Sequence, residues 1–279
     1  MKTMKYIIAI FAIAALFGAC TERIDIELDS TYERLVVEGM ISTDTGVQYV
    51  RLTKSSDYYS GAAPVGISNA SVKLSSGLGT LTLSENPDKP GYYETGADFH
   101  GEIGVTYDLN IELEQAIGEH KSYNASGKIM SIGVIDSIRV EYNDNWDIYE
   151  VQIFALEPPS TDFYMFEIYK NGDLLTDSIN KVWISDDRYF NGNYTQGALV
   201  GVLDPENTRE NPEPGDTITL KMSSITKDYY DFILQVQDQT FQYRNPLFSG
   251  PPANVLTNVE NAHGFFATYS TTYSSTIFK

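Results

Sequence analysis

The chain has 279 residues, of which 38 are acidic and 19 are basic, so its formal net charge at pH 7 is −19. A hydrophobic fraction of 42% excludes a disordered or collagen-like protein, and the acidic balance disfavours a nucleic-acid partner because such a surface repels phosphate. The single cysteine excludes an intramolecular disulfide and a cysteine-rich zinc site.

The first twenty residues have the pattern of a bacterial lipoprotein signal peptide. Two lysines precede an apolar run over residues 6–17, which has the length of a signal-peptide core and is too short to span a bilayer. Gly-Ala follows, immediately before Cys20, and small residues before a cysteine suit the lipoprotein signal peptidase. We therefore predict a signal peptide over residues 1–19 and lipidation of Cys20. The alternative is an ordinary secretory signal followed by a chance cysteine.

An acidic, polar segment over residues 20–33 is expected to tether the folded part of the protein to lipid. Its composition fits an export signal and a solvated leader that carries no signal equally well. No later apolar run reaches the length of about 18 residues that a spanning helix needs, so lipid is the expected membrane anchor.

Residues 34–128 carry the pattern of a small β-sandwich. Short apolar runs alternate with turn signals such as Asp44-Thr45-Gly46 and Ser75-Ser76-Gly77. The clearest strand covers residues 105–113, where apolar and polar side chains alternate and so lie on opposite faces. Several short strands at this spacing predict an immunoglobulin-like (Ig-like) sandwich that ends near residue 128.

Residues 129–279 are predicted to form a second β-rich domain. Its most apolar run, residues 163–169, is expected to be a strand buried on both faces. Residues 225–241 contain no Gly or Pro and place apolar side chains at helical spacing. We predict one amphipathic helix there, capped by Ser224 or Thr226, with an aromatic stripe that packs on a sheet rather than forming a ligand site. The predicted fold class is therefore mainly β with one helix.

Several landmarks together resemble a known family. They are LVVEGMI, NASVKL, PGYYE, GVTYDLNIEL and the tail PPANVLTNVENAHGFFATYS over residues 251–270. In combination they resemble the Bacteroidetes outer-membrane lipoproteins grouped as domain of unknown function 4249, and the tail is the most specific part. The resemblance implies an outer-membrane lipoprotein that is often encoded beside a TonB-dependent transporter of the SusC-like type. It supplies no catalytic residues.

No motif in the sequence indicates catalysis or a bound cofactor, because GxSxG, HExxH and phosphate-binding glycine patterns are all missing. We therefore expect a protein that is not an enzyme. The best metal candidate is the loop that contains Asp186, Asp187, Asn191 and Asn193, whose side-chain oxygens suit calcium. It lacks the EF-hand pattern, so a plain polar turn is the alternative.

Bacteria of the Bacteroidetes phylum O-glycosylate exported proteins at the pattern Asp-(Ser/Thr)-(small or aliphatic), and we single out the four matches whose third residue is Thr or Ile. The acceptor residues would be Ser30, Ser137, Ser178 and Thr217. Because the motif is short, we treat these sites as hypotheses.

The sequence and the resemblance together predict a surface-tethered outer-membrane lipoprotein. It would be a non-catalytic binding or accessory subunit of a TonB-dependent, SusC-like nutrient uptake system. Its expected partners are membrane lipid through Cys20, the transporter, and a small ligand, glycan or peptide, for which the many tyrosines offer stacking faces. The alternatives are a structural or adhesive surface protein and a hydrolase whose site the sequence does not reveal.

Overall fold

The computed structural model describes residues 33–55, 63–243 and 254–279. The predicted signal peptide, Cys20 and Ser30 lie outside these residues. Within the described part, no helix is both long enough and apolar enough to cross a membrane.

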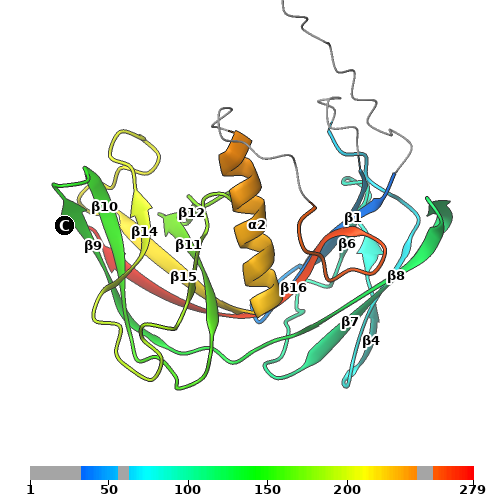
Figure 1. Ribbon diagram of the computed structural model, residues 1–279, viewed down its shortest axis with the longest axis horizontal. Helices are drawn as coiled ribbons and strands as arrows, with labels where there is room; N and C mark the ends of the chain where they lie inside the picture. Colours follow the sequence, from blue (N-terminus) through cyan, green and yellow to red (C-terminus); the bar gives the residue numbers. More distant parts are fainter. Residues whose placement is uncertain (1–32, 56–62, 244–253) are drawn as a thin grey trace, which may run out of the picture. The chain divides into compact units, whose positions relative to one another are not determined.

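The fold is mainly β, as predicted, and contains one described helix (Figure 1). The strands in chain order are β1 (Leu35–Ser42), β2 (Tyr49–Lys54), β3 (Ser71–Ser76), β4 (Gly79–Thr82), β5 (Ser84–Glu85), β6 (Tyr92–Glu94), β7 (Thr106–Ile117), β8 (His120–Lys128), β9 (Ile135–Asn143), β10 (Ile148–Ala155), β11 (Phe163–Lys170), β12 (Asp173–Leu174), β13 (Trp183–Asp186), β14 (Ala198–Leu203), β15 (Thr217–Ile225) and β16 (His263–Ile277). The helix α2 (Lys227–Tyr243) lies between β15 and β16 in the chain.

The described strands form three sheets. The largest has nine strands in the order β12-β11-β15-β16-β1-β2-β6-β5, with β13 also paired to β11. A three-stranded sheet has the order β14-β10-β9, and a four-stranded sheet has the order β4-β3-β7-β8. The described pairings are antiparallel except for that of β1 with β16, which is parallel.

The long strand β16 connects the two halves of the large sheet (Figure 1). Its first half pairs with β1, from Val36↔His263 to Ser42↔Tyr269, and its second half pairs with β15. Strands from both sides of the predicted boundary at residue 128 therefore lie in one sheet, and Glu33–Lys279 form one compact unit. The boundary itself falls between β8 and β9 and stays a prediction.

The first core lies where β1, β2 and β6 face the four-stranded sheet. It contains the apolar face of β7, on which Tyr107, Leu109 and Ile111 are at most 4% exposed, as the alternation in the sequence predicted. Burying each such side chain fully contributes about 1.5–3 kcal/mol. Two sheets thus share one core in this region, whereas the Ig-like arrangement of their strands stays a prediction.

The second core lies where β11 and β15 face the three-stranded sheet. Tyr164, Phe166 and Ile168 of β11 point into it, while Met165 between them points to the opposite face. The prediction that this strand is buried on both faces is therefore confirmed. Gly201 of β14 allows a close approach, because a Cβ atom there would lie 2.4 Å from Cδ1 of Ile168.

The helix α2 covers the other face of β11, β15 and β16, and it starts two residues later than predicted because Ile225 still pairs in β15. The Thr226 side chain caps it, since its Oγ1 accepts a hydrogen bond of 3.3 Å from the backbone N–H of Tyr229. The fully buried Ile233 and the partly buried Tyr229 and Phe232 pack on the sheet. The predicted packing of the stripe is thus confirmed.

Candidate functional site

A pocket with a volume of about 560 Å³ lies beside α2. Its lining comes from α2, from β1, β2, β11 and β16, and from the segment over residues 174–182. The same helical stripe that packs on the sheet also forms one wall of this pocket. Ligand sites are usually preformed concavities of about 300–1,000 Å³, so this volume is in the ordinary range.

Aromatic rings dominate the helical side of the pocket. Tyr229, Phe232 and Phe265 contact one another, with ring centroids 5.1 Å apart for each of the two contacts to Phe265 and 6.0 Å apart for Tyr229–Phe232. Tyr49 of β2 and Tyr269 of β16 also line the pocket. Through these mutual contacts the three rings form one continuous aromatic surface on this side of the pocket.

Three carboxylates line the same pocket, and each is paired with a basic side chain. Glu38 lies 3.1 Å from Arg51. Asp177 lies 2.6 Å from Arg209 and 3.0 Å from Lys181. Glu167 lies 3.1 Å from Lys221. The described lining residues include no Lys, Arg or His, so the basic partners of these carboxylates lie outside the lining.

Lys221 of β15 is the most buried of these basic residues, with 8% of its surface exposed. Its Nζ lies 3.1 Å from Oε2 of Glu167, 3.4 Å from Oδ2 of Asp44 and 5.6 Å from the ring centroid of Tyr269. Burial by itself lowers the pKa of Lys221, but Glu167, Tyr273 and the other surrounding acidic groups outweigh burial and raise it. Lys221 therefore stays charged at neutral pH.

Two tyrosine hydroxyls in the pocket are free to bind a ligand. Within the described residues, the hydroxyls of Tyr49 and Tyr229 make no hydrogen bond, and that of Tyr269 contacts only the sulfur of Met40, at 3.7 Å. Burial raises the pKa of both Tyr49 and Tyr229. Each hydroxyl therefore keeps its proton at neutral pH and can donate as well as accept a hydrogen bond.

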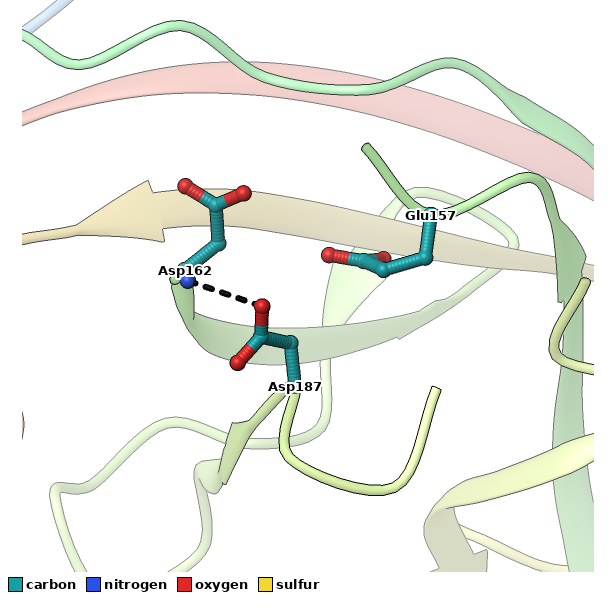
Figure 2. A group of neighbouring side chains, drawn as sticks. All are labelled: Glu157, Asp162 and Asp187. Carbon is teal, nitrogen blue, oxygen red and sulfur yellow. Dashed lines mark hydrogen bonds between the residues drawn. The ribbon is translucent and has the colours of Figure 1, made fainter. Parts of the chain in front are cut away.

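A second candidate site consists of three acidic side chains, Glu157, Asp162 and Asp187 (Figure 2). One carboxylate oxygen from each lies within 4.8 Å of the others, and the residues are 7%, 9% and 4% exposed. Glu157 follows β10, Asp162 precedes β11, and Asp187 follows β13. Because β13 runs antiparallel to β11, the end of one strand lies beside the start of the other.

The hydrogen bonds of this acidic cluster come from uncharged donors. Tyr164 donates to Glu157, Ser160 donates to Asp162 at 2.6 Å, and the backbone N–H of Asp162 donates to Asp187 at 3.1 Å (Figure 2). Burial raises the pKa of Glu157, and its two acidic neighbours raise it further against the hydrogen bond from Tyr164. Buried carboxylates without a basic partner either share protons or hold a cation, and carboxylate oxygens suit calcium.

The loop predicted to bind calcium contributes one residue, Asp187, to this cluster. Asp186 instead pairs with Arg188, whose Nε lies 2.8 Å and 2.9 Å from the two carboxylate oxygens. The amides of Asn191 and Asn193 donate to backbone oxygens within and beside the loop. Calcium binding by these four residues stays a prediction. The sequence analysis missed Glu157 and Asp162, since only the pairing of β13 with β11 brings them to Asp187.

The three predicted glycosylation sites that lie within the described residues are all exposed. Ser137 is in β9, Thr217 begins β15, and Ser178 follows β12 and lines the pocket beside α2. Their modification stays a prediction.

The fold and the pocket define a β-rich protein with a preformed pocket beside its helix. The chain belongs to the family described as Domain of unknown function (DUF4249), whose family model matches residues 21–275. This confirms the family resemblance, while the lipoprotein and Bacteroidetes attributions stay predictions. No curated protein matches the chain.

Among solved structures, one match is the crystal structure at 2.00 Å of a Bacteroides uniformis ATCC 8492 protein that is provisionally described as carbohydrate binding. The two chains are 12% identical, the match covers 68% of this chain and 88% of that chain, and the TM-score is 0.22. At this TM-score the likeness carries no argument about fold or function.

Proposed function

We propose that this protein is a non-catalytic binding lipoprotein of the outer-membrane surface, which serves a TonB-dependent, SusC-like transporter as an accessory subunit. The pocket beside α2 would hold the ligand, which is a small molecule, glycan or peptide. The observation that carries the proposal is this pocket, because packed aromatic rings, paired carboxylates and free tyrosine hydroxyls surround one concavity.

The chemistry of the pocket favours binding over catalysis. Its carboxylates are ion-paired and its tyrosines keep their protons, so these groups are suited to forming hydrogen bonds rather than to transferring protons near neutral pH. The membrane part of the proposal is supported by the signal-peptide pattern that precedes Cys20 and by membership of the family.

The test is co-purification of a transporter with the affinity-tagged protein. The full-length protein should be expressed in its native host, extracted in detergent with and without prior crosslinking in intact cells, and analysed by mass spectrometry. A TonB-dependent transporter is expected in both preparations. The Cys20→Ala variant is the matched control, since loss of the anchor should deplete the complex. If neither preparation contains a transporter while nutrient is being imported, the accessory function is wrong.

One observation favours the adhesive alternative. Trp146, in the turn between β9 and β10, is 76% exposed, and the neighbouring Tyr142 is 45% exposed. Exposed aromatic side chains of this kind are frequent anchors of protein–protein contacts. If no transporter is recovered, a surface contact through this hairpin becomes the leading function. The hydrolase alternative would need the acidic cluster to reach a substrate, and its three residues are nearly sealed from solvent.

A further inference from the structure

We infer that the pocket beside α2 selects a neutral carbohydrate over peptides and charged ligands. The inference rests on the proposed function of this pocket as a ligand site and adds the chemical class of its ligand. Charge, free hydrogen-bonding groups, aromatic faces and strand pairing each contribute to it.

The charges in the pocket favour a neutral ligand. Glu38, Glu167 and Asp177 are the charged groups of the described lining, so an anion would be repelled at close range. A cation is not needed either, because each carboxylate already lies within 3.1 Å of a basic side chain outside the lining. A neutral ligand leaves these ion pairs intact.

The polar groups that remain free favour a ligand with several hydroxyls. Tyr49 and Tyr229 offer hydroxyls without partners in the described part of the chain. A tyrosine hydroxyl both donates and accepts a hydrogen bond, as a sugar hydroxyl does. A polyol satisfies these hydroxyls, while a purely apolar ligand would leave them without partners at a cost in affinity.

The aromatic wall favours a ring with an apolar face. Tyr229, Phe232 and Phe265 present contiguous rings next to these polar groups. A sugar ring has C–H groups on its faces and hydroxyls at its rim, so one face can contact the aromatic rings while the rim reaches the hydroxyls of Tyr49 and Tyr229.

Strand pairing disfavours an extended peptide. Peptides that bind along a sheet need a free strand edge for their backbone hydrogen bonds. Strands β1, β2 and β11, which line the pocket, are paired with neighbouring strands on both sides. The lining part of β16 pairs with β1, and the Asn258 side chain hydrogen-bonds both backbone groups of Phe266. The edge strand β12, whose Leu174 also lines the pocket, has only two residues. The described lining therefore offers an extended peptide little free strand edge.

The test is binding of the full-length protein, in detergent, to an array of neutral and acidic glycans, followed by calorimetry with the strongest neutral glycan. Tyr229→Phe and Tyr49→Phe each remove a hydroxyl that makes no hydrogen bond within the described chain, so the variants should fold normally. Each is expected to weaken binding about tenfold, which corresponds to one lost hydrogen bond. Tyr189→Phe, at a residue that is 81% exposed outside the pocket, is the matched control and should bind like the wild type.

Three outcomes would overturn the inference: binding only to acidic glycans, binding to no neutral glycan on the array, or neutral binding that both pocket variants leave unchanged. Unaltered melting temperatures of the variants would show that any loss of binding is not a loss of folding. Co-purification of a transporter without neutral-glycan binding would overturn this inference and leave the accessory function standing. Neutral-glycan binding without co-purification of a transporter would support this inference and overturn the accessory function.

Discussion

Replacing Lys221 by methionine is expected to destabilise the folded state by about 3–5 kcal/mol, because the carboxylates of Glu167 and Asp44 would lose the ammonium group between them. Both Lys221 and Glu167 have side chains that are at most 15% exposed, so solvent screens their interaction weakly. For a chain of this size, such a loss corresponds to a fall in melting temperature of roughly 10 °C. Urea denaturation followed by far-UV circular dichroism measures the change.

Two further variants separate the effect of losing the ion pair on stability from the effect of losing a long side chain. The double variant Lys221→Met/Glu167→Gln removes both charges and should recover part of the loss, since no uncompensated Glu167 carboxylate remains. Lys227→Met removes an exposed partner of Asp231 and should cost less than about 1 kcal/mol. The reasoning is refuted if Lys221→Met costs no more than Lys227→Met, or if the double variant is no more stable than Lys221→Met.

The remaining predictions concern pH, calcium and the anchor. Burial raises the pKa of Glu157, so the contribution of Glu157 to stability is complete below the ordinary glutamate pKa and is lost as pH rises through the raised value. Glu157→Gln should therefore flatten the pH dependence of the melting temperature over that interval. An unchanged pH profile would contradict this. If the acidic cluster holds calcium, adding calcium raises the melting temperature of the wild type but not that of Asp187→Asn, and a chelator reverses the rise. If calcium raises the melting temperature of both proteins equally, it binds elsewhere. Cys20→Ala should be released from membranes by a carbonate wash, and retention there would mean a different anchor.

Lysine 221 also makes stability depend on alkaline pH. Its pKa is raised in the folded state, so its contribution is complete below the unfolded lysine pKa of about 10.4 and is lost as pH rises through the folded value. The Lys221→Met variant should therefore lose less stability than the wild type as the pH is raised through this interval. Thermal melts at a series of alkaline pH values give the comparison.

Local patterns in the sequence predicted much of the secondary structure. The alternation along residues 105–113 identified the buried face of β7, and helical spacing with Thr226 as a cap identified α2. Strand β8 was not predicted, because its sequence is polar and its buried apolar side chains are only Tyr123 and Ala125. Pairing with β7, rather than its own composition, determines that this segment is a strand.

The sites were harder to predict because they combine distant residues. Asp187 was identified as part of a polar loop, but Glu157 and Asp162 join it only through the pairing of β13 with β11. The aromatic stripe of α2 was expected to be core, and it is both core and pocket wall, since Phe232 is only partly buried. Periodicity shows which face of a helix is apolar, but it does not show where that face extends beyond the sheet it covers.

The position of β16 at the end of the chain means that the large sheet is completed late in folding. This strand begins at residue 263, yet it completes the hydrogen bonding of β1, which begins at residue 35. Contacts between such distant parts of a chain slow folding, because a long loop must close before the pairing contributes any stability. Until β16 is added, β1 and β15 each present an unpaired edge, which is a template for aggregation. We therefore expect truncation before residue 263 to yield aggregates rather than two smaller folded domains, and slow refolding with a tendency to aggregate in the intact chain.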